Sequence, residues 1–129
     1  MGESNVRVES LTPILRIFDE EKAKQFYLGF LEFQLDWEHR FEVDFPLYMQ
    51  VSYGPCVIHL SEHHGDCTPG AALRIEVRGI QELHAKLLSK RYNYARPGLE
   101  TAPWGGLEIR VADPFGNRLT FYQKDGTER

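Results

Sequence analysis

The alternation of hydrophobic and polar residues divides the chain into two series of segments with the same order. Residues 11–18 form the first apolar run, and its β-branched Thr12, Ile14 and Ile17 favour a strand. Asp19 follows as a candidate helix N-cap. Apolar residues then recur at the spacing of one helical face, at Ala23, Phe26, Tyr27 and Phe30. A strand followed by a helix is therefore predicted, with the helix stopping near Gly29.

Three further strands are predicted to complete the first series. Residues 33–37 alternate, with Phe33, Leu35 and Trp37 set against two polar residues. The remaining strands are residues 45–52 and 56–60, which are separated by a turn at Tyr53-Gly54-Pro55.

The order restarts at residue 71. The expected elements are a strand at 71–77, a helix with Ile80, Leu83, Leu87 and Leu88 on one face, an irregular stretch at 92–102 with room for a short strand, and strands at 107–111 and 119–122 around a turn at 113–117. The two series correspond at an offset of about 60 residues. The matching pairs are Leu15 and Ile17 with Ile75 and Val77, Ala23 and Tyr27 with Leu83 and Leu87, and Ile58 and Leu60 with Leu119 and Phe121. We expect a single α+β domain, residues 1–129, with similar halves at 11–62 and 71–123 joined by a polar linker at 63–70.

Composition narrows the class of protein. The 129 residues, 42% hydrophobic and 26% charged, suit one globular domain. A net charge of -4 argues against nonspecific nucleic-acid binding, and no apolar run is long enough for a membrane span. The N-terminal residues lack the pattern of a signal peptide, and two cysteines make no disulfide framework. A cytoplasmic location is expected, and a disulfide between Cys56 and Cys67 stays open.

Several motifs of the second half carry a family resemblance. They are Pro103-Trp104-Gly105-Gly106, the strand that follows, the Asp113-Pro114-Phe115-Gly116-Asn117 turn, and the stretch from Val77 to Leu83. Together they resemble the glyoxalase/bleomycin-resistance family of the vicinal oxygen chelate superfamily, closest to bleomycin-resistance-like binding proteins. The resemblance implies two βαβββ modules whose curved mixed sheets surround a cavity (the glyoxalase/bleomycin-resistance/dioxygenase fold), and a homodimer with ligand sites near the subunit interface. Glu32 departs from the family pattern, which has glycine there.

The resemblance also indicates where a metal would bind. Enzymes of the superfamily take His, Gln or Glu ligands from four strands, and the matching positions here are Thr12, His59, Ala72 and Thr120. Only His59, a weak candidate, suits a divalent metal. No metal and no cofactor are therefore expected. This makes a glyoxalase-like lyase or isomerase, or an extradiol-dioxygenase-like enzyme, the less favoured alternative.

A second group of potential ligands gathers around the linker. Its members are Cys56, His59, Glu62, His63, His64, Asp66 and Cys67, but their spacing fits no zinc motif. No phosphate-binding, dinucleotide-binding or serine-nucleophile motif is present, and Cys56 is expected to pack in the core beside Ile58. No catalytic residue is predicted.

Strand alternation assigns two faces to the expected sheets. Leu15, Ile17, Leu73, Ile75, Val77, Leu119 and Phe121 are expected under the helices. The concave side then receives Thr12, Ile14, Arg16, Val57, His59, Ser61, Ala72, Arg74, Glu76, Arg118, Thr120 and Tyr122. The arginines either form an internal ion network, with Glu76 as a partner, or grip an anionic or hydrogen-bonding ligand. The predicted ligand-binding residues are Trp37, Phe41, Tyr48, His59, Arg74, Glu76, Trp104, Arg118 and Tyr122.

The favoured function is metal-independent binding of a small molecule by a homodimer, with antibiotic sequestration as one form of it. Because the inferred cavity is rich in arginine, a neutral or anionic ligand is expected in place of a cationic drug. A non-catalytic structural or regulatory module, with its cavity filled by its own side chains, is the remaining alternative.

Overall fold

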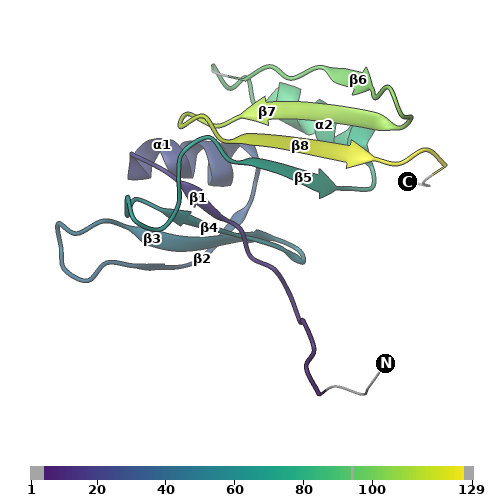
Figure 1. The fold of residues 1–129 in the computed structure, drawn as a ribbon. Helices are drawn as coiled ribbons and strands as arrows, with labels where there is room; N and C mark the ends of the chain where they lie inside the picture. Colours follow the sequence, from purple (N-terminus) through teal and green to yellow (C-terminus); the bar gives the residue numbers. More distant parts are fainter. Residues whose placement is uncertain (1–4, 94, 127–129) are drawn as a thin grey trace.

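The computed structural model describes residues 5–93 and 95–126, and these residues form two four-stranded mixed sheets (Figure 1). The first sheet, in the order β1-β4-β3-β2, contains β1 (Ile14–Arg16), β2 (Gln34–His39), β3 (Tyr48–Tyr53) and β4 (Cys56–Ser61). The second sheet, in the order β5-β8-β7-β6, contains β5 (Ala72–Glu76), β6 (Leu99–Thr101), β7 (Leu107–Ala112) and β8 (Arg118–Gln123). In each sheet the first strand runs parallel to the last, and the remaining pairs are antiparallel. The predicted α+β class, with its repeated strand order, is confirmed.

A helix follows the first strand of each sheet. In the first half α1 (Glu20–Lys24) continues as a π-helical segment η1 (Gln25–Phe30), and in the second half α2 (Ile80–Ser89) is regular. The Asp19 carboxylate accepts a hydrogen bond from the Lys22 backbone N–H at 2.8 Å, which confirms the predicted N-cap.

The first helix ends at Phe30, next to Gly29, near which the sequence predicted its stop. The residue that takes the left-handed conformation after the helix is Glu32, with φ 63°. A glycine would adopt this conformation without strain, whereas Glu32 brings a carboxylate that pairs with Lys86 of α2 at 3.2 Å and with Lys90, the C-cap of α2, at 2.5 Å. The departure from the family pattern therefore ties the end of the first helix to the second.

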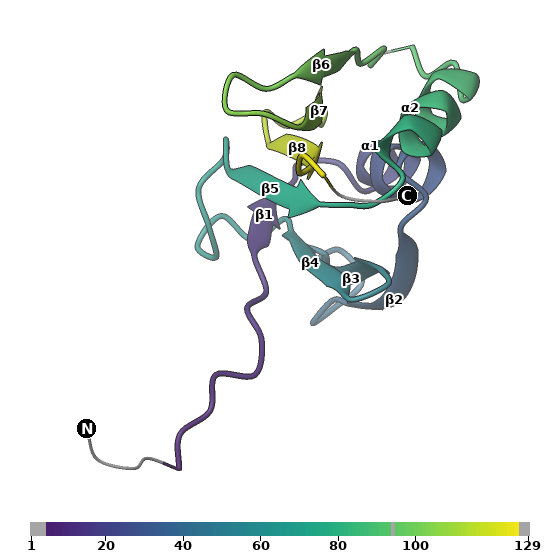
Figure 2. The ribbon, with the colours of Figure 1, turned by 90° about the vertical axis from the view of Figure 1, so that its right-hand side faces the viewer.

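The core is one cluster that includes residues of both halves. Leu15, Ile17, Leu119 and Phe121 are buried in it, as predicted, and Leu73, Ile75 and Val77 pack against it. The helices cover the inner faces of the two sheets (Figure 2). Among the residues that the structure describes, no helix or strand covers the opposite, outer faces of the sheets (Figure 2).

The Asp113–Asn117 turn joins the halves through hydrogen bonds of its buried end residues, Asp113 and Asn117. Asp113 accepts from the backbone N–H groups of Phe115 and Asn117 at 2.9 and 2.8 Å, which shapes the turn itself. The Asn117 amide donates to the Arg16 carbonyl at 2.8 Å and accepts from the Ala71 N–H at 3.2 Å. The turn, which precedes β8, thus fixes β1 and the end of the linker relative to the second sheet.

The N-terminal segment extends away from the body of the protein (Figures 1 and 2). Strand β1 begins only at Ile14, so Thr12 lies before the strand. The sequence had predicted Thr12 within the strand. The segment exposes three apolar side chains, Val6, Val8 and Leu11. Both ends of the expected domain, residues 1–4 and 127–129, lie outside the described residues.

Two smaller expectations concern cysteines and membranes. Cys56 and Cys67 are both free thiols in the structure. Within residues 5–93 and 95–126, no helix has the length and apolar character needed to cross a membrane.

Candidate functional site

The outer face of the first sheet carries a row of aromatic and polar side chains. The strand register aligns Ile14, His59, Gln50 and Trp37 across the four strands. Residues that are aligned in this way point to the same side of a sheet, so these four side chains share the face opposite the helices.

Trp37 reaches this face because of an irregularity in β2. Leu35 pairs with Val51 and Trp37 pairs with Gln50, so the register shifts by one residue at Asp36. Simple alternation would place Trp37 on the same side as Leu35, against the core. The bulge turns it outward, where its side chain is 44% exposed and its ring stacks on Tyr48 with centroids 6.0 Å apart and planes at 10°.

The His59 imidazole lies in the middle of a hydrogen-bonded chain on this face. Its Nδ1 lies 2.7 Å from the Tyr48 hydroxyl, and its Nε2 lies 2.9 Å from the Gln50 side-chain oxygen. The Gln50 amide nitrogen in turn donates to Asp36 at 3.1 Å. Since the Gln50 oxygen only accepts, the proton of neutral His59 lies on Nε2, and Nδ1 accepts from Tyr48. Partial burial lowers the pKa of His59, which favours this neutral form.

The outer face of the second sheet is built around Arg74 of β5. Its guanidinium carbon lies 4.4 Å from the ring centre of Tyr122 and 5.5 Å from that of Trp104, within the range of cation–π contact. Its Nη1 also lies 3.2 Å from the buried carboxylate of Glu108 in β7. Arg110 approaches the same carboxylate at 3.6 Å. A pocket of about 260 Å³ lies beside Arg74, and its lining includes Trp104, Glu108, Tyr122, Leu107, Lys124 and Asp125.

The two glycines after Trp104 bring this residue to the pocket. Gly106 has φ 87°, and a Cβ atom there would lie 2.5 Å from the backbone oxygen of Gln123. The loop before β7 therefore approaches the end of β8 closely only because position 106 has no side chain. Trp104 itself remains 71% exposed beside Arg74.

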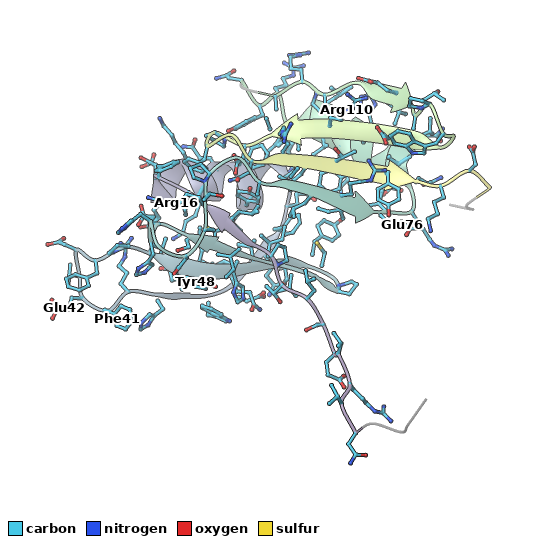
Figure 3. All side chains as sticks on the ribbon, viewed as in Figure 1. Arg16, Phe41, Glu42, Tyr48, Glu76 and Arg110 are labelled. Atoms are coloured by element: carbon cyan, nitrogen blue, oxygen red, sulfur yellow. The ribbon has the colours of Figure 1, made fainter. Side chains whose placement is uncertain are left out.

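The nine residues predicted as ligand-binding fall into two groups and some outliers. Trp37, Tyr48 and His59 lie together on the first sheet, and Arg74, Trp104 and Tyr122 lie together on the second. The remaining three lie at the margins, with Phe41 beside His39 in the loop after β2, Glu76 at the end of β5 and Arg118 at the start of β8. The two groups lie on different sheets of one chain, and Figure 3 shows Tyr48 at the lower sheet and Arg110 at the upper one.

The sequence left open an ion network between the arginines and Glu76, and the structure shows a different carboxylate in that role. Glu76 lies 3.6 Å from Lys124, whereas Arg74 pairs with Glu108. Glu108, Arg110 and Gln50 were missed as residues of the outer faces. The alternation of Leu107, Ile109 and Val111 with Glu108 and Arg110 contained the signal for two of them.

The residues on these faces do not suit a divalent metal. The register places Ile14 of β1 beside His59 and Arg74 of β5 beside Thr120, so β1 and β5 supply no His, Gln or Glu ligand at these positions. Gln50 of β3 also adjoins His59. Both ring nitrogens of His59 already have partners in Tyr48 and Gln50. Across residues 5–93 and 95–126, no three His, Cys, Asp or Glu side chains are close enough together to hold a metal ion.

Comparison with known proteins gives a family match over almost the whole chain. A family model described as "Glyoxalase superfamily protein" matches residues 2–128. A search of curated protein sequences finds no match.

Solved structures with the same fold include binding proteins and enzymes. A glyoxalase-related enzyme from Clostridium phytofermentans has a TM-score of 0.73 at 20% identity, covering 95% of this chain and 99% of its own. A bleomycin-binding protein complexed with bleomycin has a TM-score of 0.69 at 19% identity, covering 92% and 100%. A bleomycin resistance determinant encoded on the transposon Tn5 has a TM-score of 0.69 at 18% identity, covering 92% and 99%. At these identities the similarity shows the fold, and the ligand has to be argued from the residues themselves.

Proposed function

Because this chain belongs to the glyoxalase superfamily, we propose that it is a metal-independent binding protein for a small molecule, of the bleomycin-resistance-like type. The observation that carries the proposal is the state of His59. It is the one ligand-type residue at the matching metal positions, and Tyr48 and Gln50 hold both of its nitrogens. The hydrogen-bonded imidazole is instead part of a surface suited to a ring-shaped ligand, beside the stacked Trp37 and Tyr48.

We further propose that two copies of the chain complete each site. One chain presents the Trp37 group on the outer face of the first sheet and the Arg74 group on the outer face of the second. Within residues 5–93 and 95–126, no helix or strand covers either face (Figure 2). A homodimer that sets the first sheet of one copy against the second sheet of the other would place a ligand between the two tryptophans. The exposed Val6, Val8 and Leu11 of the extended N-terminal segment supply further apolar surface for such an interface.

The charges on the second sheet favour a neutral or anionic ligand. Arg74, Arg110 and Arg118 face outward there, and Glu108 neutralises part of this charge. Arg74 keeps 47% of its side chain exposed while it contacts Glu108, so it retains donors for a carboxylate. Two structures with this fold are named for bleomycin. The corresponding function of this chain would be sequestration of an antibiotic whose charge differs from that of a cationic drug.

The two alternatives receive less support. A metal-dependent lyase, isomerase or dioxygenase needs ligands that Thr12, Ala72 and Thr120 do not supply. Ile14 and Arg74, which the register places beside His59 and Thr120, do not supply them either. A structural module with a filled cavity does not account for the open pocket of about 260 Å³ beside Arg74. The free thiols of Cys56 and Cys67 fit the proposed location in a reducing cytoplasm.

The proposal is tested by titrating the intrinsic tryptophan fluorescence with 2-naphthoate and, separately, with bleomycin. Trp37 and Trp104 are the two tryptophans of the chain, so the signal comes only from the proposed faces. We expect saturable quenching by 2-naphthoate that is the same after EDTA treatment and with added Zn²⁺, and weaker binding of bleomycin. Binding that requires Zn²⁺ would reject metal independence, and tighter binding of bleomycin would reject the inferred ligand charge.

A further inference from the structure

A second pocket lies between the two halves, away from the outer faces. It has a volume of about 330 Å³. Its apolar walls come from both halves and include Leu31, Phe33, Cys56, Ile75, Leu83 and Phe121. The end of the first helix, the β3–β4 hairpin, the second sheet and α2 therefore all contribute to one space.

This pocket and the Arg74 group lie on opposite sides of the same strands. Ile75 and Phe121 are aligned partners in β5 and β8, and both point toward the helices. Arg74 and Tyr122 are their neighbours in sequence and point to the outer face. A molecule in this pocket would thus contact the back of the proposed site without entering it.

The volume sets the size of an occupant. An apolar cavity of about 150 Å³ is enough to hold benzene. A space of about 330 Å³ therefore suits a bicyclic ring system, and it is too small for a helix, whose diameter with side chains is about 10 Å.

The charges at the rim indicate an uncharged occupant. Two carboxylates, Glu76 and Glu82, and two cations, Arg78 and Lys86, border the pocket, so their formal charges cancel. Lys86 is already paired with Glu32 at 3.2 Å, and Glu76 with Lys124 at 3.6 Å. A balanced rim gives no preference for an ion, but it offers hydrogen-bonding groups to a hydroxyl or a ring N–H.

Cys56 makes the inner wall neutral as well. Its side chain is partly buried, and this burial raises the pKa of the thiol, so the sulfur is uncharged near neutral pH. An uncharged thiol is a soft apolar surface, suited to contact with an aromatic ring.

We infer that the space between Leu31, Cys56, Ile75 and Leu83 is a second binding site, which takes an uncharged bicyclic aromatic molecule with one polar group. The inference does not depend on the proposed function, because the two sites have separate walls and separate reporters.

The test uses Cys56 as the reporter and indole as the probe. In a Cys67→Ser variant, Cys56 is the sole cysteine of the chain, and its alkylation by iodoacetamide at pH 8.5 is followed by mass spectrometry. Millimolar indole is expected to slow alkylation at least fivefold, and the protection should saturate. An alkylation rate that indole does not change would overturn the inference.

Two variants of α2 give matched controls. Leu83→Trp is expected to fill the pocket, slowing alkylation without indole and removing any further effect of indole. Leu88→Trp, at an exposed position of the same helix outside the pocket, should leave the effect of indole intact.

If Leu83→Trp does not fold, amide chemical shifts of the Cys67→Ser protein test whether indole binds in the pocket. Indole must then perturb Ile75 and Phe121 more than Arg118, and the reverse order would reject the site. Protection that rises with protein concentration in the absence of indole would assign the pocket to a second copy of the chain and would also overturn the inference.

Discussion

The Tyr27 hydroxyl donates a hydrogen bond of 2.6 Å to the Asp113 carboxylate, across 86 residues of sequence. Tyr27 comes from the first helix and Asp113 from the turn of the second half, and both are buried. Asp113 also accepts from the Asn117 side chain and from two backbone N–H groups. The bond therefore connects the two halves at a buried point.

Tyr27→Phe is predicted to lower the free energy of unfolding by about 1–3 kcal/mol, because it leaves a buried carboxylate with one donor fewer. Urea unfolding followed by circular dichroism measures this change. Tyr53→Phe, at an exposed tyrosine, is the matched control and should change stability by less than about 0.5 kcal/mol. Equal losses in the two variants would contradict the role of the bond.

The same residue predicts a dependence of stability on alkaline pH. Burial, and then the charge of Asp113, raise the pKa of Tyr27 far above its usual 10. The pKa of Tyr27 is higher in the folded chain than in the unfolded chain, so its full contribution to the free energy of unfolding is present below pH 10. This contribution is lost as the pH rises above 10, because Tyr27 of the unfolded chain then releases its proton. The decline in stability above pH 10 should be shallower in Tyr27→Phe than in the unchanged protein. Identical slopes in the two proteins would contradict the assignment.

Gly106→Ala is predicted to lower the free energy of unfolding by about 2 kcal/mol or more, since it adds a Cβ at a positive φ and against the Gln123 backbone. Thermal unfolding measures the loss, and tryptophan fluorescence should show a displaced Trp104. Gly65→Ala is the control, because a Cβ there meets nothing within 4 Å and φ is not positive. An unaffected Gly106→Ala protein would mean that Trp104 is placed by something other than the close approach of the two loops.

His59 is predicted to titrate below its usual value of 6.5, because burial opposes its charge. The unfolded chain then takes up the proton first, so stability should be complete above pH 6.5 and fall as the pH is lowered through the folded-state pKa. NMR titration of the imidazole measures the midpoint. In Tyr48→Phe, Nδ1 loses its donor and becomes free to take a proton, so the midpoint should rise toward 6.5. A midpoint that Tyr48→Phe leaves unchanged would argue against the hydrogen-bonded chain.

Arg74→Ala is predicted to weaken 2-naphthoate binding about tenfold, as expected for loss of one charged hydrogen-bonding group. It should also lower stability, by about 1 kcal/mol, because Glu108 keeps only the more distant Arg110. The double change Arg74→Ala and Glu108→Gln separates the two effects, since it should restore stability but not binding. Arg96→Ala, at an exposed position, is the charge-matched control. Recovery of binding in the double variant would show that Arg74 acts through structure alone.

The repeated strand order and most of the core were predictable because they follow from alternation, which a single sequence shows directly. Leu15, Ile17, Leu119 and Phe121 are buried as their spacing indicated. The outward position of Trp37 was not predictable from alternation, because it depends on a bulge at Asp36 that has no mark in the composition of the strand.

Two other differences have similar causes. The last part of the first helix is π-helical, with bonds five residues apart such as Leu31 N–H to the Phe26 carbonyl at 2.9 Å, and the helical spacing of apolar residues did not indicate this. Arg74 pairs with Glu108 by a diagonal contact, since the register aligns Arg74 with Thr120 and aligns both Glu76 and Glu108 with Tyr122. Helix period and strand register are set by tertiary packing, and the sequence pattern alone leaves both open.

The central proposal is that the Trp37 face of one copy and the Trp104 face of another form a single site. The most direct measurement is a ¹⁹F NMR titration of protein labelled with 5-fluorotryptophan, with 2-naphthoate as the ligand in the presence of EDTA. Trp37→Phe and Trp104→Phe assign the two resonances. We predict that both resonances shift with one common dissociation constant. A response from only one tryptophan, or two dissociation constants that differ by tenfold or more, would contradict a shared site.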